Sequence, residues 1–337
     1  MHSRITLAAV AILGLLTITA CEAGTAPGPA ASSPAPTPTH PQVTKAEAET
    51  HLAAYVALNN KANAKFDEKL LAQYETGASL VIDKAHYRAV KSAKKTPPGF
   101  KPFDLRDAEY FPVRSTAYPR VFLTRGHQRN LDGTKSQSGW KYQLFRQETE
   151  GGPWLQFFSP VGEIKDSEPQ PEVATDAEGL ATEVPLDASE LLIPPSKFAA
   201  NYTARLLGKP LPEKNVQFVG VDTWTSSQAA YRKKLKQFAK VIERAAPSTE
   251  HLSYALRTKD GGALVFATIS YKIRLDPHKN SWVTDTSGTG FLKQNTPYRG
   301  FMEMNYLLNL LAYVPPAGGS KIRMIGSYSG MTSASGA

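Results

Sequence analysis

Apolar and polar positions in the first half of the chain change from a helical to a strand-like spacing. Thr44 and Glu47 form a capping-box pattern, in which a threonine N-cap is followed three residues later by a glutamate. Leu52, Tyr55 and Val56 follow at helical spacing, which indicates an amphipathic helix. Helices are therefore predicted over residues 45–65, 68–75 and about 84–94.

Four strand-like runs follow these helices, and the sequence between them is typical of hairpin turns. Around Tyr142 and Leu144, apolar and polar residues alternate with the period of two expected for a half-buried strand. The connectors NLDGTKSQSG and EGGP carry glycine-rich turn sequences, and the first contains an Asp-Gly pair. Helices followed by a meander of strands indicate an α+β unit rather than a Rossmann alternation. The predicted strands cover residues 103–111, 118–125, 140–147 and 154–160.

The second half begins with two further predicted helices. One covers residues 197–207 and is stopped by Gly208 and Pro210. The other begins at Thr225, but residues 240–244 also fit an extended strand. Its apolar face would consist of Tyr231, Leu235, Phe238 and Ile242.

Strands close the second half, as they close the first. The turn KDGG joins two apolar runs and is a strong hairpin signal. Apolar side chains from Ile269 to Leu275 alternate with polar ones, which predicts one buried and one solvated face. The predicted strands cover residues 251–258, 262–275, 301–314 and 321–328.

A polar, proline-containing segment, residues 162–178, separates the halves. We therefore expect an α+β protein with two tandem domains, 44–165 and 166–330, each with helices packed on a curved, cone-like antiparallel sheet. One fused sheet system fits the same pattern, and the shared order of elements suggests an internal duplication. The small, polar tail, residues 331–337, is expected to be disordered.

The chain opens with an apolar run that ends in its only cysteine. Residues 5–20 are almost all apolar or small and follow Arg4, which is typical of a signal peptide over residues 1–20 and is shorter than the roughly 20 residues that a membrane span needs. The stretch ITAC, residues 18–21, resembles the lipobox of bacterial lipoproteins. That resemblance implies cleavage before Cys21 and lipid on its sulfur, whereas an ordinary secretory signal or a weak anchor helix is the alternative.

A second cysteine is missing, so disulfides cannot stabilise the folded part. Residues 22–43 consist mainly of Pro, Ala, Ser, Thr and Gly and cannot form a core. We expect the segment 21–43 to be a lipidated, disordered tether that reaches on the order of 70 Å. Such a tether would hold the folded body off the membrane, and a Pro-rich recognition motif is the alternative.

Two segments near the C-terminus resemble a known group of proteins. TKDGGALVFATISYKIRL and LLAYVPPAGGSKIRMIGSYSG, together with the lipobox and the tether, resemble actinobacterial cell-surface lipoproteins of unknown function. The helix-then-meander order also resembles the nuclear-transport-factor-2-like or cystatin-like α+β fold. This resemblance implies a long helix across a curved sheet and supplies no catalytic residue. It also implies an apolar pocket, for which the lining or core candidates are Tyr55, Phe66, Tyr87, Tyr110, Phe157 and Phe158.

Motifs for catalysis, metals and cofactors are weak in this sequence. Ser92-Ala93-Lys94-Lys95 fits the S-x-x-K pattern, but the accompanying K-T-G and S-x-N elements are missing. In GSYSG, Tyr328 stands where a nucleophile elbow needs serine. The histidines show no metal-binding spacing, NLDGTKSQSG lacks the ligands of a calcium loop, and no phosphate loop or dinucleotide fingerprint occurs. We expect no catalytic, metal or cofactor site.

Positive charge is the remaining signal. The formal net charge is +9 at pH 7, and removal of Arg4 with the signal leaves about +8. One basic cluster lies between residues 84 and 101, and the other comprises Arg232, Lys233, Lys234, Lys236 and Lys240. The apolar face opposite the second cluster indicates either a core-facing helix, which we favour, or a membrane-surface helix. Nucleic acid is not expected as a partner outside the cell, whereas anionic lipids or wall polymers are.

These observations favour a lipid-anchored, extracytoplasmic binding or interaction module without a catalytic site. Its expected partners are the cytoplasmic membrane and an envelope protein or an anionic wall polymer. The alternative is an enzyme that performs acid–base chemistry in a cone-shaped cavity. For that alternative, the candidate residues are Asp104 and Asp107 with either Tyr110 or His86.

Overall fold

The computed structural model describes residues 42–93, 100–162, 169–220, 222–285 and 290–337, all of which belong to one compact unit that begins at His40. The expected signal peptide, Cys21 and nearly all of the tether lie outside these residues. In the described part of the chain, none of the helices combines the length and apolar character needed to cross a membrane.

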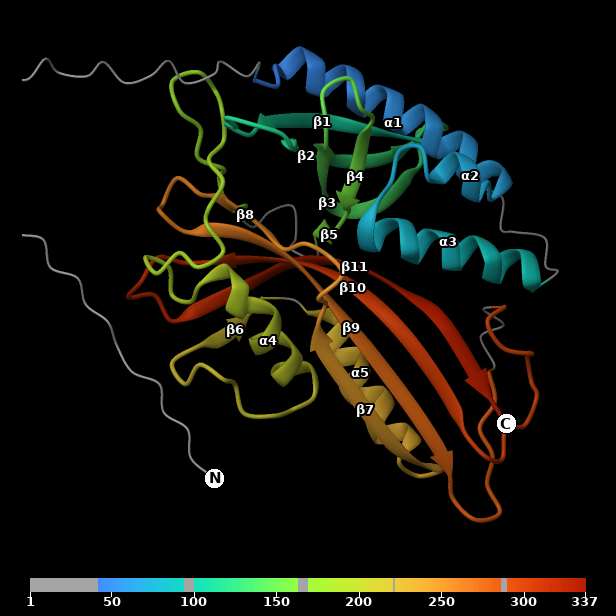
Figure 1. Ribbon diagram of the computed structural model, residues 1–337. Coiled ribbons are helices and arrows are strands. Elements are labelled where there is room, and N and C mark those ends of the chain that lie inside the picture. The colour runs from blue at the N-terminus through green and yellow to red at the C-terminus, as the bar shows by residue number, and fades with distance from the viewer. Residues whose placement is uncertain (1–41, 94–99, 163–168, 221, 286–289) are drawn as a thin grey trace, which may run out of the picture. The chain divides into compact units, whose positions relative to one another are not determined.

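Five helices and eleven strands make up the described unit (Figure 1). The helices are α1 (Lys45–Lys65), α2 (Glu68–Leu71), α3 (Gly77–Ser92), α4 (Pro195–Leu206) and α5 (Thr223–Leu235). The strands of the first half are β1 (Phe103–Pro112), β2 (Arg120–Asn130), β3 (Lys135–Gln147), β4 (Trp154–Phe158) and β5 (Val161–Gly162). Those of the second half are β6 (Gln217–Val219), β7 (Ala239–Pro247), β8 (Tyr254–Arg257), β9 (Ala263–Pro277), β10 (Met302–Val314) and β11 (Lys321–Gly336).

All eleven strands belong to one sheet, so the α+β class is confirmed and the fused arrangement is the one observed. The main path runs β1-β2-β3-β5-β11-β10-β9-β7, and its pairings are antiparallel. The short strand β5 pairs with β3 on one side and with β11 on the other, and thereby joins the halves. Two separate cones are not seen, and the likeness to the cone-shaped fold stays a prediction, as does a domain boundary between residues 165 and 166.

The sheet folds back on itself, so that the molecule has four layers (Figure 1). Apolar side chains of α1 pack with Phe122 and Phe145 on one face of β2 and β3. The opposite face of these strands packs against β8–β11 in a second cluster that includes Leu144 and Phe266. The largest cluster lies beyond β9 and β10, where Phe198 of α4 is buried. Because successive side chains of a strand point to opposite faces, the layers are α1/α2, β1–β4, β8–β11 and α4/α5.

Several predicted elements agree closely with the structure, and the first helix does so at its cap. The Thr44 hydroxyl accepts a hydrogen bond from the backbone N–H of Glu47 at 3.0 Å, as the capping box predicts. The predicted strands of the first half correspond to β1–β4, and those of the second half to β8–β11. The KDGG turn lies between β8 and β9. These elements combine a strong local pattern with a clear turn.

Two expectations are wrong, the start of the third helix and the disordered tail, and the alternative left open for residues 240–244 is resolved in favour of a strand. Helix α3 begins at Gly77, seven residues before the predicted start. Residues 239–247 form β7 beside β9, so the fifth helix ends at Leu235. The tail is not disordered, because β11 extends to Gly336 along β10 and Ala337 exchanges backbone hydrogen bonds with Phe301.

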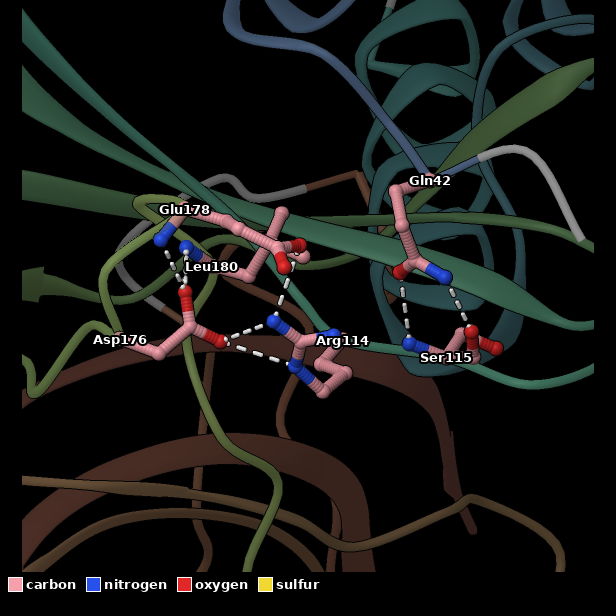
Figure 2. A network of polar contacts seen from close by, with 6 residues as sticks. All are labelled: Gln42, Arg114, Ser115, Asp176, Glu178 and Leu180. Atoms are coloured by element: carbon pink, nitrogen blue, oxygen red, sulfur yellow. Dashed lines mark hydrogen bonds and ion pairs between the residues drawn. The ribbon is translucent and has the colours of Figure 1, made fainter. Parts of the chain in front are cut away.

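The start of the described chain is fixed to the end of β1 (Figure 2). The side-chain amide of Gln42 pairs with the backbone of Ser115, whose N–H donates to Gln42 Oε1 at 2.9 Å. Beside this pair, Arg114 donates two hydrogen bonds to Asp176 at 2.8 and 2.6 Å and one to Glu178 at 3.1 Å. These contacts hold the connection between the halves and the start of the folded unit against the same corner of the sheet.

Glycines surround β5 at the junction of the two halves. Gly139 has a positive φ of 97°, and a Cβ built on it would overlap the carbonyl oxygen of Gly162. A Cβ on Gly326 of β11 would likewise overlap the carbonyl group of Val161. Since these neighbours are backbone atoms of paired strands, they cannot move aside without breaking the pairing.

The substitution Gly326→Ala should therefore destabilise the protein strongly. We expect a loss of about 3 kcal/mol or more in the free energy of unfolding, because the added methyl group displaces β5. Chemical denaturation followed by tryptophan fluorescence measures this loss. Ser335→Ala in the same strand is the matched control, since Ser335 is exposed. Equal stability of the two variants would contradict the proposed role of the junction.

Candidate functional site

The candidate site is a cluster of charged and hydroxyl side chains beneath α3. Glu75 precedes α3, Asp83 lies in its second turn, Lys141 is on β3 and Tyr328 is on β11. The segment that carries Glu75 is joined to β4, because the N–H of Thr76 donates to the carbonyl of Gln156 at 2.9 Å. The fold thus brings together groups from both halves of the chain.

Glu75 and Asp83 form a pair of hydrogen-bonded carboxyl groups. Burial raises the pKa of Glu75 far above its usual value, and the charge of Asp83 raises it further. Burial also raises the pKa of Asp83, although its hydrogen bonds to Tyr328 and Glu75 oppose this shift. Two neighbouring carboxylates in a desolvated site cannot both ionise cheaply, so the two groups share one proton.

Lys141 and Tyr328 complete the charged core of the cluster. The Tyr328 hydroxyl donates a hydrogen bond to Asp83 Oδ1, and burial raises the pKa of this tyrosine. Burial lowers the pKa of Lys141, while the nearby charges of Asp83 and Glu75 oppose that shift. The Lys141 ammonium donates to Gln128 at 3.2 Å and lies 5.2 Å from the ring centre of Phe103. A lysine cation opposite one ionised carboxyl group leaves the cluster close to neutral.

A layer of tyrosine and amide side chains surrounds this core and fixes its shape. Gln156 donates to the Tyr55 hydroxyl at 3.0 Å. On α1, Asn59 and Asn63 accept hydrogen bonds from two further tyrosines, at 3.2 Å from Tyr74 and at 2.9 Å from Tyr87. The hydroxyl groups are therefore held in place rather than free to rotate.

Three buried polar atoms near the pair have no hydrogen-bond partner among the described residues: Glu75 Oε2, Thr124 Oγ1 and Gln143 Nε2. Thr124 and Gln143 are directly opposite each other on β2 and β3. They lie on the sheet face that carries Phe122 and Phe145, which is the face under the helices. An unpaired buried polar atom costs about 1–3 kcal/mol, so these atoms are suited to contact a bound molecule.

Members of the cluster differ in how deeply they are buried. Asp83, Lys141 and Tyr328 are half-buried as residues, and burial shifts the pKa of each one. Glu75, Thr124 and Gln143 are fully buried.

A groove lies on the other side of α3, above the open face of β7, β9 and β10. Its volume is about 630 Å³, within the usual range for ligand pockets. Val81 of α3 lines it together with Arg244, Ser270, Lys272 and Asn305 of the strands. A cavity of about 200 Å³ shares Glu250 and His251 with the groove. Burial lowers the pKa of His251.

The residues suggested by the sequence for an acid–base site do not converge. Asp104 pairs with Arg106 at 3.2 Å at the surface. Exposed Asp107 lies at a bulge of β1, and Tyr110 is half-buried against the core beneath α1. Only His86 lies near the observed cluster, where its charge lowers the pKa of Asp83.

The six aromatic residues expected around an apolar pocket belong mainly to the core. Phe157 and Phe158 are buried between the halves. Phe66 and Tyr110 are partly buried and pack against the hydrophobic core beneath α1. Tyr55 and Tyr87 are buried there too, but their hydroxyl groups join the polar layer. In the described part of the chain, no group of three or more His, Cys, Asp and Glu side chains could hold a metal ion. Of the S-x-x-K segment, Ser92 ends α3, and Lys94 and Lys95 lie outside the described residues.

Glu75 and Asp83 are not among the residues predicted for a site, because the sequence pattern predicts a start of α3 seven residues too late. With the helix starting at Gly77, Ser79, Asp83 and Tyr87 are four residues apart and share one face. Ser79 and Tyr87 are buried, so an aspartate between them is the signal that a longer helix would have revealed.

The carboxyl pair should make stability depend on pH. Above pH 4.5, the usual pKa of the Glu75 carboxyl group, the unfolded chain releases a proton that the folded chain keeps. Stability therefore falls as the pH rises. Between pH 5 and 7.5, we expect the free energy of unfolding of wild type to fall by on the order of 1–2 kcal/mol more than that of Glu75→Gln. Urea denaturation at several pH values measures this difference. Glu49→Gln, which removes an exposed carboxyl group of α1, should follow wild type, and parallel profiles for all three proteins would contradict the shared proton.

Comparisons with known proteins agree on one family. The sequence profile described as "Domain of unknown function (DUF8094)" matches residues 39–336. The uncharacterised lipoprotein SCO2278 of Streptomyces coelicolor is 28% identical, with 88% of this chain and 87% of the relative covered. An uncharacterised lipoprotein of Streptomyces avermitilis is 26% identical, with 88% and 87% covered.

A third relative, the uncharacterised lipoprotein SCO6871 of Streptomyces coelicolor, is 25% identical, with 96% of this chain and 91% of the relative covered. These relatives confirm the lipid-anchored, extracytoplasmic location and the predicted resemblance to actinobacterial lipoproteins. Lipidation at Cys21 itself and the absence of catalysis stay predictions. The chain belongs to the DUF8094 family, whose match extends over almost the whole described unit.

Proposed function

We propose that this lipoprotein is an extracytoplasmic binding module that holds a small polar ligand at the Glu75–Asp83 pair. The observation that carries the proposal is a pair of hydrogen-bonded carboxyl groups in which Glu75 Oε2 has no partner among the described residues, beside two further unpartnered buried atoms on Thr124 and Gln143. Polar groups held in such an environment are more common at binding and active sites than in ordinary cores.

The unpartnered polar atoms select the ligand class. Glu75 Oε2 can accept a hydrogen bond, the Thr124 hydroxyl can donate or accept one, and the amide nitrogen of Gln143 donates. A polyol or an amine matches this mixture of donors and acceptors. An anionic ligand is disfavoured, because it would approach an ionised carboxyl group in a poorly solvated site.

An enzyme that uses the same pair is the second candidate function. A carboxyl group with a raised pKa beside an ionised partner and a tyrosine hydroxyl is suited to proton transfer. This site differs from the one suggested by the sequence, since neither Asp104 nor Asp107 belongs to it.

An envelope protein or an anionic wall polymer is the macromolecular partner that we propose from the excess positive charge.

Thermal unfolding with a panel of glycerol, glucose, glucosamine and putrescine tests the binding proposal. At least one compound should raise the midpoint of wild type by several degrees at saturating concentration. Asp83→Asn should lose this increase, because the amide, although its oxygen can still accept from Tyr328, cannot ionise or share a proton with Glu75. Asp104→Asn, an aspartate-to-asparagine change at the surface, should keep it.

Equal stabilisation of wild type and Asp83→Asn by every active compound would contradict binding at the pair, as would no stabilisation by any of them. Consumption of a stabilising compound by wild type, but not by Asp83→Asn, would instead support the enzyme. Mass spectrometry of the compound after incubation distinguishes these outcomes.

A further inference from the structure

A patch of exposed aromatic and lysine side chains lies where α5 ends and β7 begins. We name it the basic aromatic patch; it comprises Tyr231, Lys233, Lys234, Lys236, Phe238, Lys240, Lys279 and Trp282. Phe238 is 47% exposed, Trp282 51% and Tyr231 38%. They are among the few large hydrophobic side chains that the described surface exposes.

Backbone contacts bring the two parts of the patch together. The N–H of His278 donates to the carbonyl of Phe238 at 3.0 Å, and its ring Nε2 lies 3.3 Å from the carbonyl of Lys236. Ala239 is paired with Pro277 in the sheet. The turn that carries Lys279 and Trp282 is thus fixed beside the end of α5, rather than free in solution.

Helix α5 does not bury the apolar face that its sequence predicted. No residue of α5 is buried, and Ile242 belongs to β7. The helix is held by partly buried Trp224 and Leu235 and by the ion pair between Arg232 and Glu243. The expectation of a core-facing helix is therefore wrong for Tyr231 and Phe238, whose side chains are exposed.

The lysines of the patch are not paired with acidic side chains of the described chain. None of its five lysines forms an ion pair with any described residue, and no acidic residue occurs between 231 and 240. The one arginine in this stretch, Arg232, is already bound to Glu243. Lysines without acidic partners suit a surface that is anionic on the outside, and exposed aromatic rings suit one that is apolar within.

We propose that the basic aromatic patch docks onto the anionic surface of a lipid bilayer. A soluble polyanion would need the lysines but would leave Phe238 and Trp282 in water, whereas a bilayer accepts both kinds of side chain. A lipid-anchored chain is already held at such a surface, which favours even a weak second contact.

The predicted tether is long enough to allow this contact. Figure 1 shows α1, near which the described chain begins, at the opposite end of the unit from the end of α5. A tether that reaches on the order of 70 Å exceeds the roughly 40 Å of a 13-residue strand such as β10. The lipid anchor and the patch can therefore contact the same bilayer, with the unit lying on its surface.

Vesicle flotation with residues 22–337, which lack the apolar segment 5–20 and the predicted acylation site Cys21 but keep the whole described unit, tests this proposal. Vesicles of phosphatidylcholine alone are compared with vesicles that contain phosphatidylglycerol. We expect binding only to the anionic vesicles. The triple variant Lys233→Gln, Lys234→Gln, Lys236→Gln should weaken it roughly 100-fold, since each lysine near an anionic surface contributes on the order of 1 kcal/mol.

Matched variants distinguish binding through the patch from binding caused by overall charge or surface hydrophobicity. Lys45→Gln, Lys61→Gln, Lys65→Gln removes the same charge from exposed positions of α1 and should retain most of the binding. Phe238→Ser should weaken binding about 10-fold or more, whereas Leu131→Ser, at another exposed hydrophobic residue, should not.

Three results would overturn the proposal: no binding to anionic vesicles, equal losses in the two triple variants, or an unchanged affinity in Phe238→Ser. If the lysine variant alone lost affinity and also lost binding to soluble polyphosphate, a polyanion rather than a bilayer would be the partner. Circular dichroism of each variant shows that the fold is intact. None of these readouts involves the Glu75–Asp83 pair.

Discussion

Close approach of backbone at the two-residue strand β5 is the constraint on which the rest of this structure depends. Gly139, Gly162 and Gly326 meet there, and side chains on the first or the last would overlap carbonyl groups of the paired strand. Because β5 pairs with β3 and β11, it converts two antiparallel meanders into one folded sheet. The buried layer between the halves and the helices outside them follow from that connection.

The same junction creates the candidate site. Lys141 is opposite Val161 of β5, and Tyr328 lies two residues beyond Gly326, so each half supplies one partner to the acids beneath α3. Their opposite charges limit the cost of burial, which is high for an isolated ion. Three buried polar atoms, on Glu75, Thr124 and Gln143, have no hydrogen-bond partner among the described residues. Desolvation of these unpaired atoms costs free energy, and hydrogen bonds to a bound molecule would offset that cost.

Local sequence signals predicted the parts of the fold but not their assembly. The Thr44 cap, the KDGG turn and the alternation from Ile269 to Leu275 act over a few residues, and they were found correctly. The path through β5 is set by two residues without any periodic pattern, so sequence could not distinguish one sheet from two. Likewise, Asp83 and Tyr328 are 245 residues apart, and nothing in the sequence indicates that they touch.

The central claim is that the Glu75–Asp83 pair holds a proton in the folded protein at neutral pH. Infrared spectroscopy tests it directly, because a protonated carboxylic acid has a C=O stretching band that is distinct from the bands of carboxylates. We predict such a band in wild type at neutral pH and its absence in Glu75→Gln. A spectrum of wild type without this band would mean that both carboxyl groups are ionised, and would contradict the account of the site.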